Sequence, residues 1–137
     1  MFFKNNKVQS EKDDLAKVAA LLIHAAKIDE NFSNEEEKII EQALFKIGAN
    51  EENIKQIIGR GKIIEENANQ ILDFTKEVKN MDEKNKIKII ETLWQIIYSN
   101  KNADLYETNL MRRLAGLLYI DSKTMGDIKD KIKKENT

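Results

Sequence analysis

The sequence contains no cysteine and no proline, and its 137 residues include one histidine and five glycines. Without cysteine there can be no disulfides and no thiolate metal sites, which fits a reducing compartment. Without proline, helices are interrupted only by glycines, asparagines and helix caps. With a single histidine, His24, and no Gly-x-Ser-x-Gly motif, a Ser–His–Asp or Cys–His arrangement has little support. We therefore predict no catalytic residues.

Net charge and long apolar runs are also missing. The 23 Lys and Arg residues balance the 24 Asp and Glu residues, so the chain has no global field that would attract nucleic acid. The richest apolar stretch, Val18 to Ala26, is far too short to span a bilayer. The first residues lack the apolar region of a secretory signal. These absences predict a cytoplasmic protein that binds no nucleic acid and does not insert into a membrane.

The apolar residues that are present recur with helical spacing, and no strand-like alternation is sustained. We predict one all-α domain over residues 1–137, a compact bundle of about seven helices, with frayed ends at residues 1–9 and 133–137. The predicted helices over residues 10–28 and 82–99 are apolar nearly all round, so they should be innermost. Gly59 and Gly61 should end or bend the third helix. Trp94 and Tyr119 lie on apolar stripes and should pack in the core.

A helix–loop–helix pattern is written twice, with Leu22 and Leu93 at equivalent places seventy-one residues apart. Each copy combines a buried helix, a polar loop, a cap and an amphipathic helix, and in this register Ser33 corresponds to Asp104. One such unit cannot bury its own apolar face, so the two copies should pack together. That packing would bring the two polar loops into one neighbourhood.

The two loops carry hard oxygen donors that suit calcium, magnesium or manganese. The predicted metal ligands are Asp29, Asn31, Glu36, Asn100 and Glu107. An EF-hand is excluded because its twelfth position, which needs a bidentate Glu, is Ile40. A second interpretation remains open, in which Ser33 to Glu36 and Asp104 to Glu107 are capping boxes and nothing more.

Three stretches together resemble the tellurite-resistance TerB-like family, particularly its small stand-alone bacterial members. They are Leu72-Asp73-Phe74-Thr75, Glu91-Thr92-Leu93-Trp94-Gln95-Ile96-Ile97-Tyr98 and Tyr106-Glu107-Thr108-Asn109-Leu110-Met111-Arg112-Arg113-Leu114-Ala115. The resemblance covers roughly Leu15 to Lys129. It implies a helical bundle with an acidic cluster suspected of binding divalent cations.

The chain departs from the family pattern in both loops. Members typically carry Asp-Gly followed by an acid-rich helix start in each repeat. Here Asp29, Glu36 and Glu107 match, whereas Asn100 replaces the second Asp, and Lys101 adds a positive charge beside it. A lost carboxylate and an added lysine both weaken a cation site electrostatically.

From the residues and the resemblance together we predict a non-enzymatic, stress-associated binding module. It would dock an unidentified protein partner and hold a divalent cation at the two-loop site, and no other cofactor is implied. One alternative is a metal-dependent enzyme that uses the same carboxylates. Another is a purely structural oligomerisation domain, which would expose an apolar patch.

Overall fold

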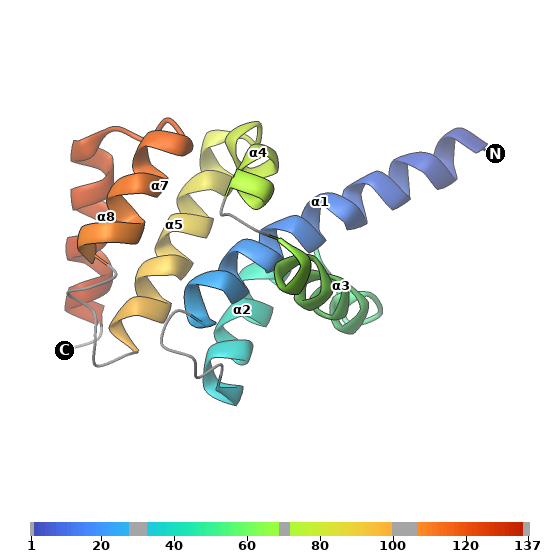
Figure 1. Cartoon of the computed structure of the whole chain (residues 1–137), viewed down its shortest axis with the longest axis horizontal. Helices are drawn as coiled ribbons and strands as arrows, with labels where there is room; N and C mark the ends of the chain where they lie inside the picture. Colours follow the sequence, from blue (N-terminus) through green and yellow to red (C-terminus); the bar gives the residue numbers. More distant parts are fainter. Residues whose placement is uncertain (1, 28–32, 69–71, 100–106, 136–137) are drawn as a thin grey trace.

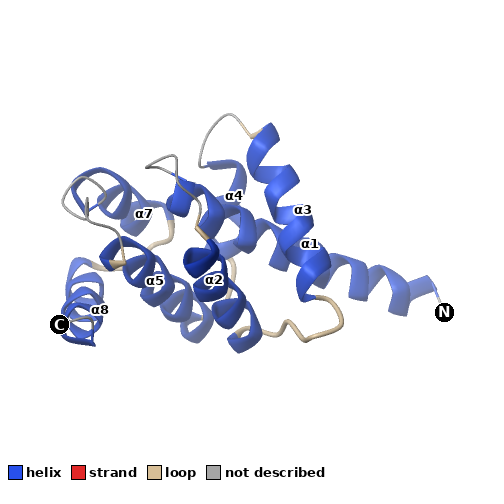
Figure 2. Ribbon diagram, turned by 90° about the horizontal axis from the view of Figure 1, so that it is seen from below, coloured by secondary structure: helices blue, strands red, loops and turns tan. Residues whose placement is uncertain are grey.

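The computed structural model describes residues 2–27, 33–68, 72–99 and 107–135, and every regular element within these ranges is helical (Figure 2). Seven α-helices and one π-helical turn follow one another along these ranges (Figure 1). They are α1 (Phe2–Ala26), α2 (Asn34–Lys46), α3 (Ile54–Asn67), α4 (Leu72–Lys79), α5 (Glu83–Tyr98), the π turn η2 (Glu107–Met111), α7 (Arg112–Leu117) and α8 (Ser122–Glu135). The predicted all-α bundle is confirmed.

The two helices predicted to be innermost carry most of the core. In α1 the run from Val18 to Ile23 is fully buried, and in α5 the buried residues include Leu93, Trp94 and Ile96. Helix α1 packs against α2, α3, α4 and α5, while α5 packs against α2 and α8 as well. Both helices therefore need apolar residues on more than one face, which is why their sequences read as apolar nearly all round.

Helix α3 is continuous through Gly59 and Gly61, so the predicted break there is wrong. A Cβ atom added at Gly61 would lie 2.8 Å from the Cβ of Ala19 and 3.1 Å from the carbonyl oxygen of Ala16. The absence of a side chain lets α3 lie directly on α1. The packing gained in this way offsets the helix-weakening effect of glycine, which is about 0.5–1 kcal/mol.

Helices α2 and α7 end in the same hydrogen-bonded turn, the Schellman motif. After α2 the N–H groups of Gly48 and Ala49 donate to the carbonyls of Phe45 and Leu44. After α7 the N–H groups of Tyr119 and Ile120 donate in the same way, to the carbonyls of Gly116 and Ala115. Two lysines of α5 reinforce these ends, since Lys88 donates to the carbonyl of Lys46 and Lys86 to that of Leu118.

Tyr119 is 71% exposed, so its predicted place in the core is wrong. Its φ of 57° is the left-handed conformation that ends α7, and the side chain points away from the helix packing as a result. The apolar position is taken by the next residue, Ile120, which is buried. The two turns stand seventy-one residues apart, but the pseudo-repeat as a whole remains a prediction.

Two further boundaries differ from the sequence analysis. Helix α1 begins at Phe2 rather than near Ser10, and its first half extends away from the bundle (Figures 1 and 2). A sixth helix, predicted from the apolar stripe of Leu110, Met111, Leu114 and Leu118, is divided into the π turn η2 and the short helix α7. Within the described ranges no helix has the length and apolar character needed to cross a bilayer.

Candidate functional site

The first turn of α2 is built as a capping box around Ser33 and Glu36. The Ser33 hydroxyl accepts a hydrogen bond from the Glu36 backbone N–H at 3.1 Å. In return, Glu36 Oε1 accepts from the Ser33 backbone N–H at 3.1 Å and from the Ser33 hydroxyl at 3.0 Å. These bonds satisfy two of the donors that every helix N-terminus leaves unpaired. The capping interpretation of Glu36 is therefore correct for Oε1.

Glu36 has a second carboxylate oxygen that the capping box does not use. The residue is 6% exposed, and Oε2 is buried without a hydrogen-bond partner among the described residues. Buried polar side-chain atoms normally have a partner, and an unpaired buried carboxylate oxygen is costly. Oε2 is thus a hard oxygen atom suited to a cation.

The structure describes few of the other predicted metal ligands. Asp29, Asn31 and Asn100 lie outside the described residues, as does the predicted cap at Asp104. Glu107 opens the π turn η2, where only the backbone is described. Within the described part of the chain, no three acidic, histidine or cysteine side chains lie close enough to hold a metal ion. Glu36 is therefore the one predicted ligand whose side chain can be placed.

The residues that flank the two predicted loops meet at a pocket between α2 and α5. Glu35, in the first turn of α2, and Ser99, which caps α5 directly before Asn100, both line this pocket of about 480 Å³. Most of its other lining groups are polar or charged: Gln42, Lys46, Thr92, Gln95 and Glu135. The chain thus leaves α5 beside the place where it enters α2. That arrangement is compatible with a single site formed by both loops.

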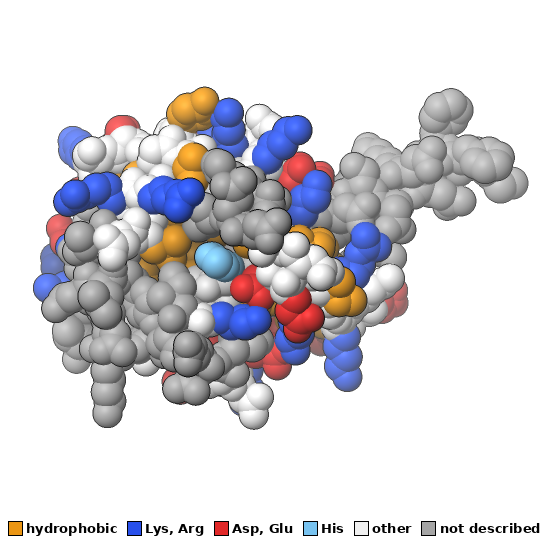
Figure 3. All heavy atoms as spheres, viewed as in Figure 1, with side chains coloured by type: hydrophobic (Ala, Val, Ile, Leu, Met, Phe, Trp, Pro, Cys, Tyr) orange, Lys and Arg blue, Asp and Glu red, His pale blue; other side chains and the backbone are white. Residues whose placement is uncertain are grey.

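The only histidine of the sequence is held at the junction of α1, α3 and α4. Nδ1 of His24 lies 3.4 Å from Oε1 of Glu65, whose other oxygen accepts from Lys27 at 2.8 Å. The imidazole also lies 5.7 Å, centroid to centroid, from the ring of Phe74. Figure 3 shows the histidine between apolar, acidic and basic side chains on one face of the molecule. These contacts give His24 a structural partner in Glu65.

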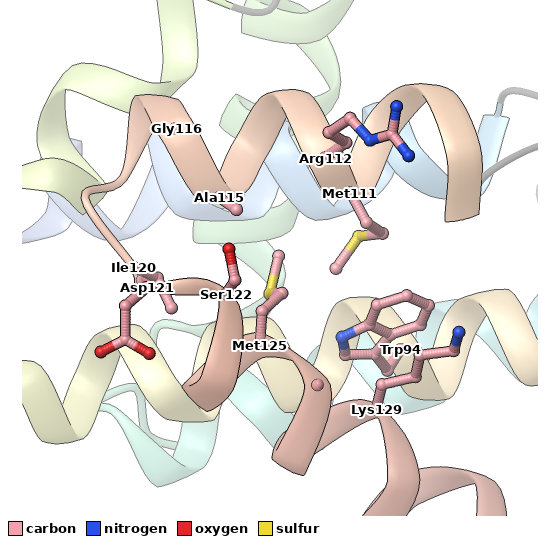
Figure 4. Close-up of a pocket in the computed structure, with 11 residues that line it drawn as sticks. Trp94, Met111, Arg112, Ala115, Gly116, Ile120, Asp121, Ser122, Met125 and Lys129 are labelled. Atoms are coloured by element: carbon pink, nitrogen blue, oxygen red, sulfur yellow. The ribbon is translucent and has the colours of Figure 1, made fainter.

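A larger pocket, of about 610 Å³, lies between α7 and α8, and sequence reasoning missed it. Trp94 of α5, Met111 of η2 and Met125 of α8 contribute to its apolar surface (Figure 4). At one end Asp121 caps α8, because its Oδ1 accepts from the Thr124 backbone N–H at 2.7 Å. That hydrogen bond holds the pKa of the Asp121 carboxyl below its usual value. The π turn η2 beside the pocket is of a type that is often found at functional sites. Such a turn has no recognisable sequence pattern, so the sequence analysis could not use it to locate the pocket.

Comparison with known proteins gives one match. The family described as "Tellurite resistance protein TerB" matches residues 15–130, which is most of the chain and runs from α1 into α8. No curated protein and no solved structure matches the chain.

Proposed function

This chain belongs to the TerB family, and on that premise we propose that it is a non-enzymatic, stress-associated binding module of the cytoplasm. In this proposal the site beside the first turn of α2 holds a divalent cation, calcium, magnesium or manganese. The occupied site then supports the docking of a partner protein. Glu36 would supply the first carboxylate, with Asp29, Asn31, Asn100 and Glu107 as the remaining ligands.

The buried Oε2 of Glu36 carries the proposal. A capping box needs one carboxylate oxygen, and Oε1 accepts both hydrogen bonds that the carboxylate receives from Ser33. A purely structural cap would be free to turn its second oxygen toward water. Here that oxygen is buried without a donor among the described residues. A divalent cation would neutralise the buried charge and satisfy the oxygen at once.

The pocket between α2 and α5 supports the second half of the proposal. Glu35 and Ser99, which flank the two loops, line this one pocket, and this supports the proposal that ligands from both loops hold a common ion. A cation that both loops bind stabilises the conformation in which the two loops lie side by side. If the partner protein binds to these loops, ion binding would therefore favour docking. The non-enzymatic assignment is supported by the place of His24, which contacts Glu65 and Phe74 and does not line the pocket between α2 and α5.

Thermal unfolding tests the cation site. Millimolar calcium, magnesium or manganese should raise the melting temperature of the parent protein, because a ligand that prefers the folded state stabilises it. Glu36→Gln keeps the shape and a hydrogen-bond acceptor for Ser33 but loses the charge, so it should remove the rise. Glu51→Gln is the matched control, since it removes an exposed carboxylate that lies outside the first turn of α2 and does not line the pocket, and it should retain the rise.

An equal rise in the parent and in Glu36→Gln would refute a site at Glu36. The absence of any rise with all three cations would leave the first turn of α2 as a helix cap. For the docking role, a protein captured by the parent chain with manganese should be lost with Glu36→Gln and kept with Glu51→Gln. Equal capture by the parent and both variants would show that partner docking does not require the cation.

A further inference from the structure

The pocket between α7 and α8 has the size and the walls of a small-molecule site. Its volume of about 610 Å³ falls within the range of roughly 300–1,000 Å³ that is usual for such sites. Figure 4 shows α7 on one side, α8 on the other, and Trp94 of α5 between them. Three helices from the C-terminal part of the chain, α5, α7 and α8, therefore line it.

The buried indole of Trp94 gives the pocket an unpaired donor. Trp94 is 2% exposed, and its Nε1–H has no acceptor among the described residues. Tyr98 stacks on the ring at 5.8 Å, and Nζ of Lys129 lies 5.8 Å from the ring centroid. In Figure 4 the indole nitrogen is on the ring edge that faces Met125, toward the interior of the pocket. Because buried donors are normally bonded, this edge is suited to a ligand that carries an acceptor.

The rest of the lining favours an apolar ligand body. Met111 and Met125 project into the space from opposite walls, and Ile120 lies at one end (Figure 4). Methionine side chains are flexible and polarizable, so they adapt to ligands of different shape. Met111 is the last residue of the π turn, a type of turn that is enriched at functional sites.

The charges around the pocket favour an anionic head group. Arg112 and Lys129 line it, against one acid, Asp121. The Asp121 carboxylate already accepts from the Thr124 backbone N–H as the cap of α8. An anion that reaches the indole edge would also come close to the ammonium group of Lys129, and charge-assisted hydrogen bonds are the stronger kind.

We propose that the pocket between α7 and α8 binds a small organic carboxylate with an apolar body. The carboxylate accepts from the Nε1–H of Trp94 beside Lys129, and the body lies against Met111 and Met125. This site is separate from the cation site at Glu36, and neither proposal depends on the other. Both aliphatic and aromatic carboxylates have this combination of a carboxylate and an apolar body, and the experiment below distinguishes between them.

The single tryptophan makes the test direct, because the protein has one indole N–H signal in a proton–nitrogen NMR spectrum. Octanoate and 2-naphthoate represent the two kinds of carboxylate. At least one of them should shift the indole signal in a saturable way, and the tighter of the two identifies the preferred body. Octanol and octylammonium have the same chain as octanoate without the negative charge, so they should bind at least about tenfold more weakly.

Two variants assign the binding to this pocket. Lys129→Gln removes the ammonium group and should weaken carboxylate binding about tenfold, whereas Lys133→Gln makes the same change at an exposed position of α8 and should not. Ser122→Glu adds a negative charge at the exposed first residue of α8, where an acid is compatible with the helix, and should also weaken binding.

Three results would overturn the proposal. They are an indole signal that neither carboxylate moves at millimolar concentration, equal binding of octanoate and octylammonium, and equal weakening by Lys129→Gln and Lys133→Gln. The position of the indole signal in the free variants shows whether each one is folded.

Discussion

The ends of α2 and α7 are the same turn made with different residues. Both turns close with the same pair of backbone hydrogen bonds, and each is followed by a buried apolar residue, Ala49 or Ile120. The residue with positive φ is Gly48 in the first turn, at 126°, and Tyr119 in the second, at 57°. Glycine adopts such angles without strain, whereas tyrosine does not. The common feature of the two turns is therefore the buried apolar residue after the positive-φ position, and not a glycine at that position.

The helices around these turns differ in how closely they pack. In the first half Gly61 lets α3 lie directly on α1, whereas Ile132, seventy-one residues later, places a large buried side chain in α8, which packs on α5. The second half also contains the pocket of about 610 Å³ between α7 and α8. A similar order of helices can thus produce a tightly packed half and a half with room for a ligand.

Core truncation should show the largest effects and should be similar in the two halves. Leu22 in α1 and Leu93 in α5 are both fully buried. Leu22→Ala and Leu93→Ala should each lower the free energy of unfolding by about 2–5 kcal/mol, because each leaves a cavity. Chemical denaturation measures this. A large effect at one leucine and less than about 1 kcal/mol at the other would show that α1 and α5 do not share the core equally.

The close contact of α1 with α3 should be the next most sensitive feature. Gly61→Ala places a methyl group against Ala19 and should cost about 1–3 kcal/mol through overpacking. Gly59→Ala is the control in the same helix, since its Cβ would meet no atom within 4 Å. It should stabilise the protein by up to about 1 kcal/mol through helix propensity. Denaturant midpoints for both variants test this, and equal shifts would mean that α3 does not lie on α1 as described.

Changing the positive-φ residue in each of the two turns should alter the free energy of unfolding less, and with opposite sign. Gly48→Ala forces a side chain into a positive φ and should cost about 1–2 kcal/mol. Tyr119→Gly relieves that strain but loses the contact between Lys79 and the tyrosine ring at 4.7 Å, so it should stabilise by less than about 1 kcal/mol. Melting temperatures report both signs. Destabilisation by Tyr119→Gly of more than about 1 kcal/mol would show that the ring contributes more than the strain removes.

The smallest effect should come from a partly buried ion pair of the first half. Lys17 donates to Glu77 at 2.9 Å between α1 and α4, and this hydrogen bond lowers the pKa of Glu77. A lowered carboxyl pKa gives stability that is present above its unfolded value and is lost as pH falls through the folded value. Lys17→Met should therefore cost less than about 1 kcal/mol at neutral pH, and the difference from the parent should fade in acid and in high salt. A difference that persists at low pH would assign the cost to packing instead.

Sequence patterns predicted the features that depend on local chemistry. Ser33 caps its helix as predicted, because a cap is decided within four residues, and Leu93 is buried because its neighbours repeat with helical spacing. Gly61 was misread because its role depends on Ala19, forty-two residues away in sequence. Tyr119 was misread because an apolar stripe does not show where the helix ends.

The candidate site could be predicted only in part for the same reason. The capping role of Glu36 follows from its spacing to Ser33, but the burial of its second oxygen depends on tertiary packing. The pocket between α7 and α8 depends on the spacing of two helices and on the π turn that ends at Met111, and neither can be recognised in a single sequence.

The most direct test of the two-loop cation site is to locate a bound manganese ion by its paramagnetic broadening of backbone amide signals. If one ion is held by both loops, the signals of Ser33, Glu36, Asn100 and Glu107 should broaden together, with a common midpoint in manganese concentration. Glu36→Gln should abolish the broadening at all four. Broadening confined to exposed acids elsewhere, such as Glu51 and Glu52, or broadening of the first loop without the second, would contradict a shared site.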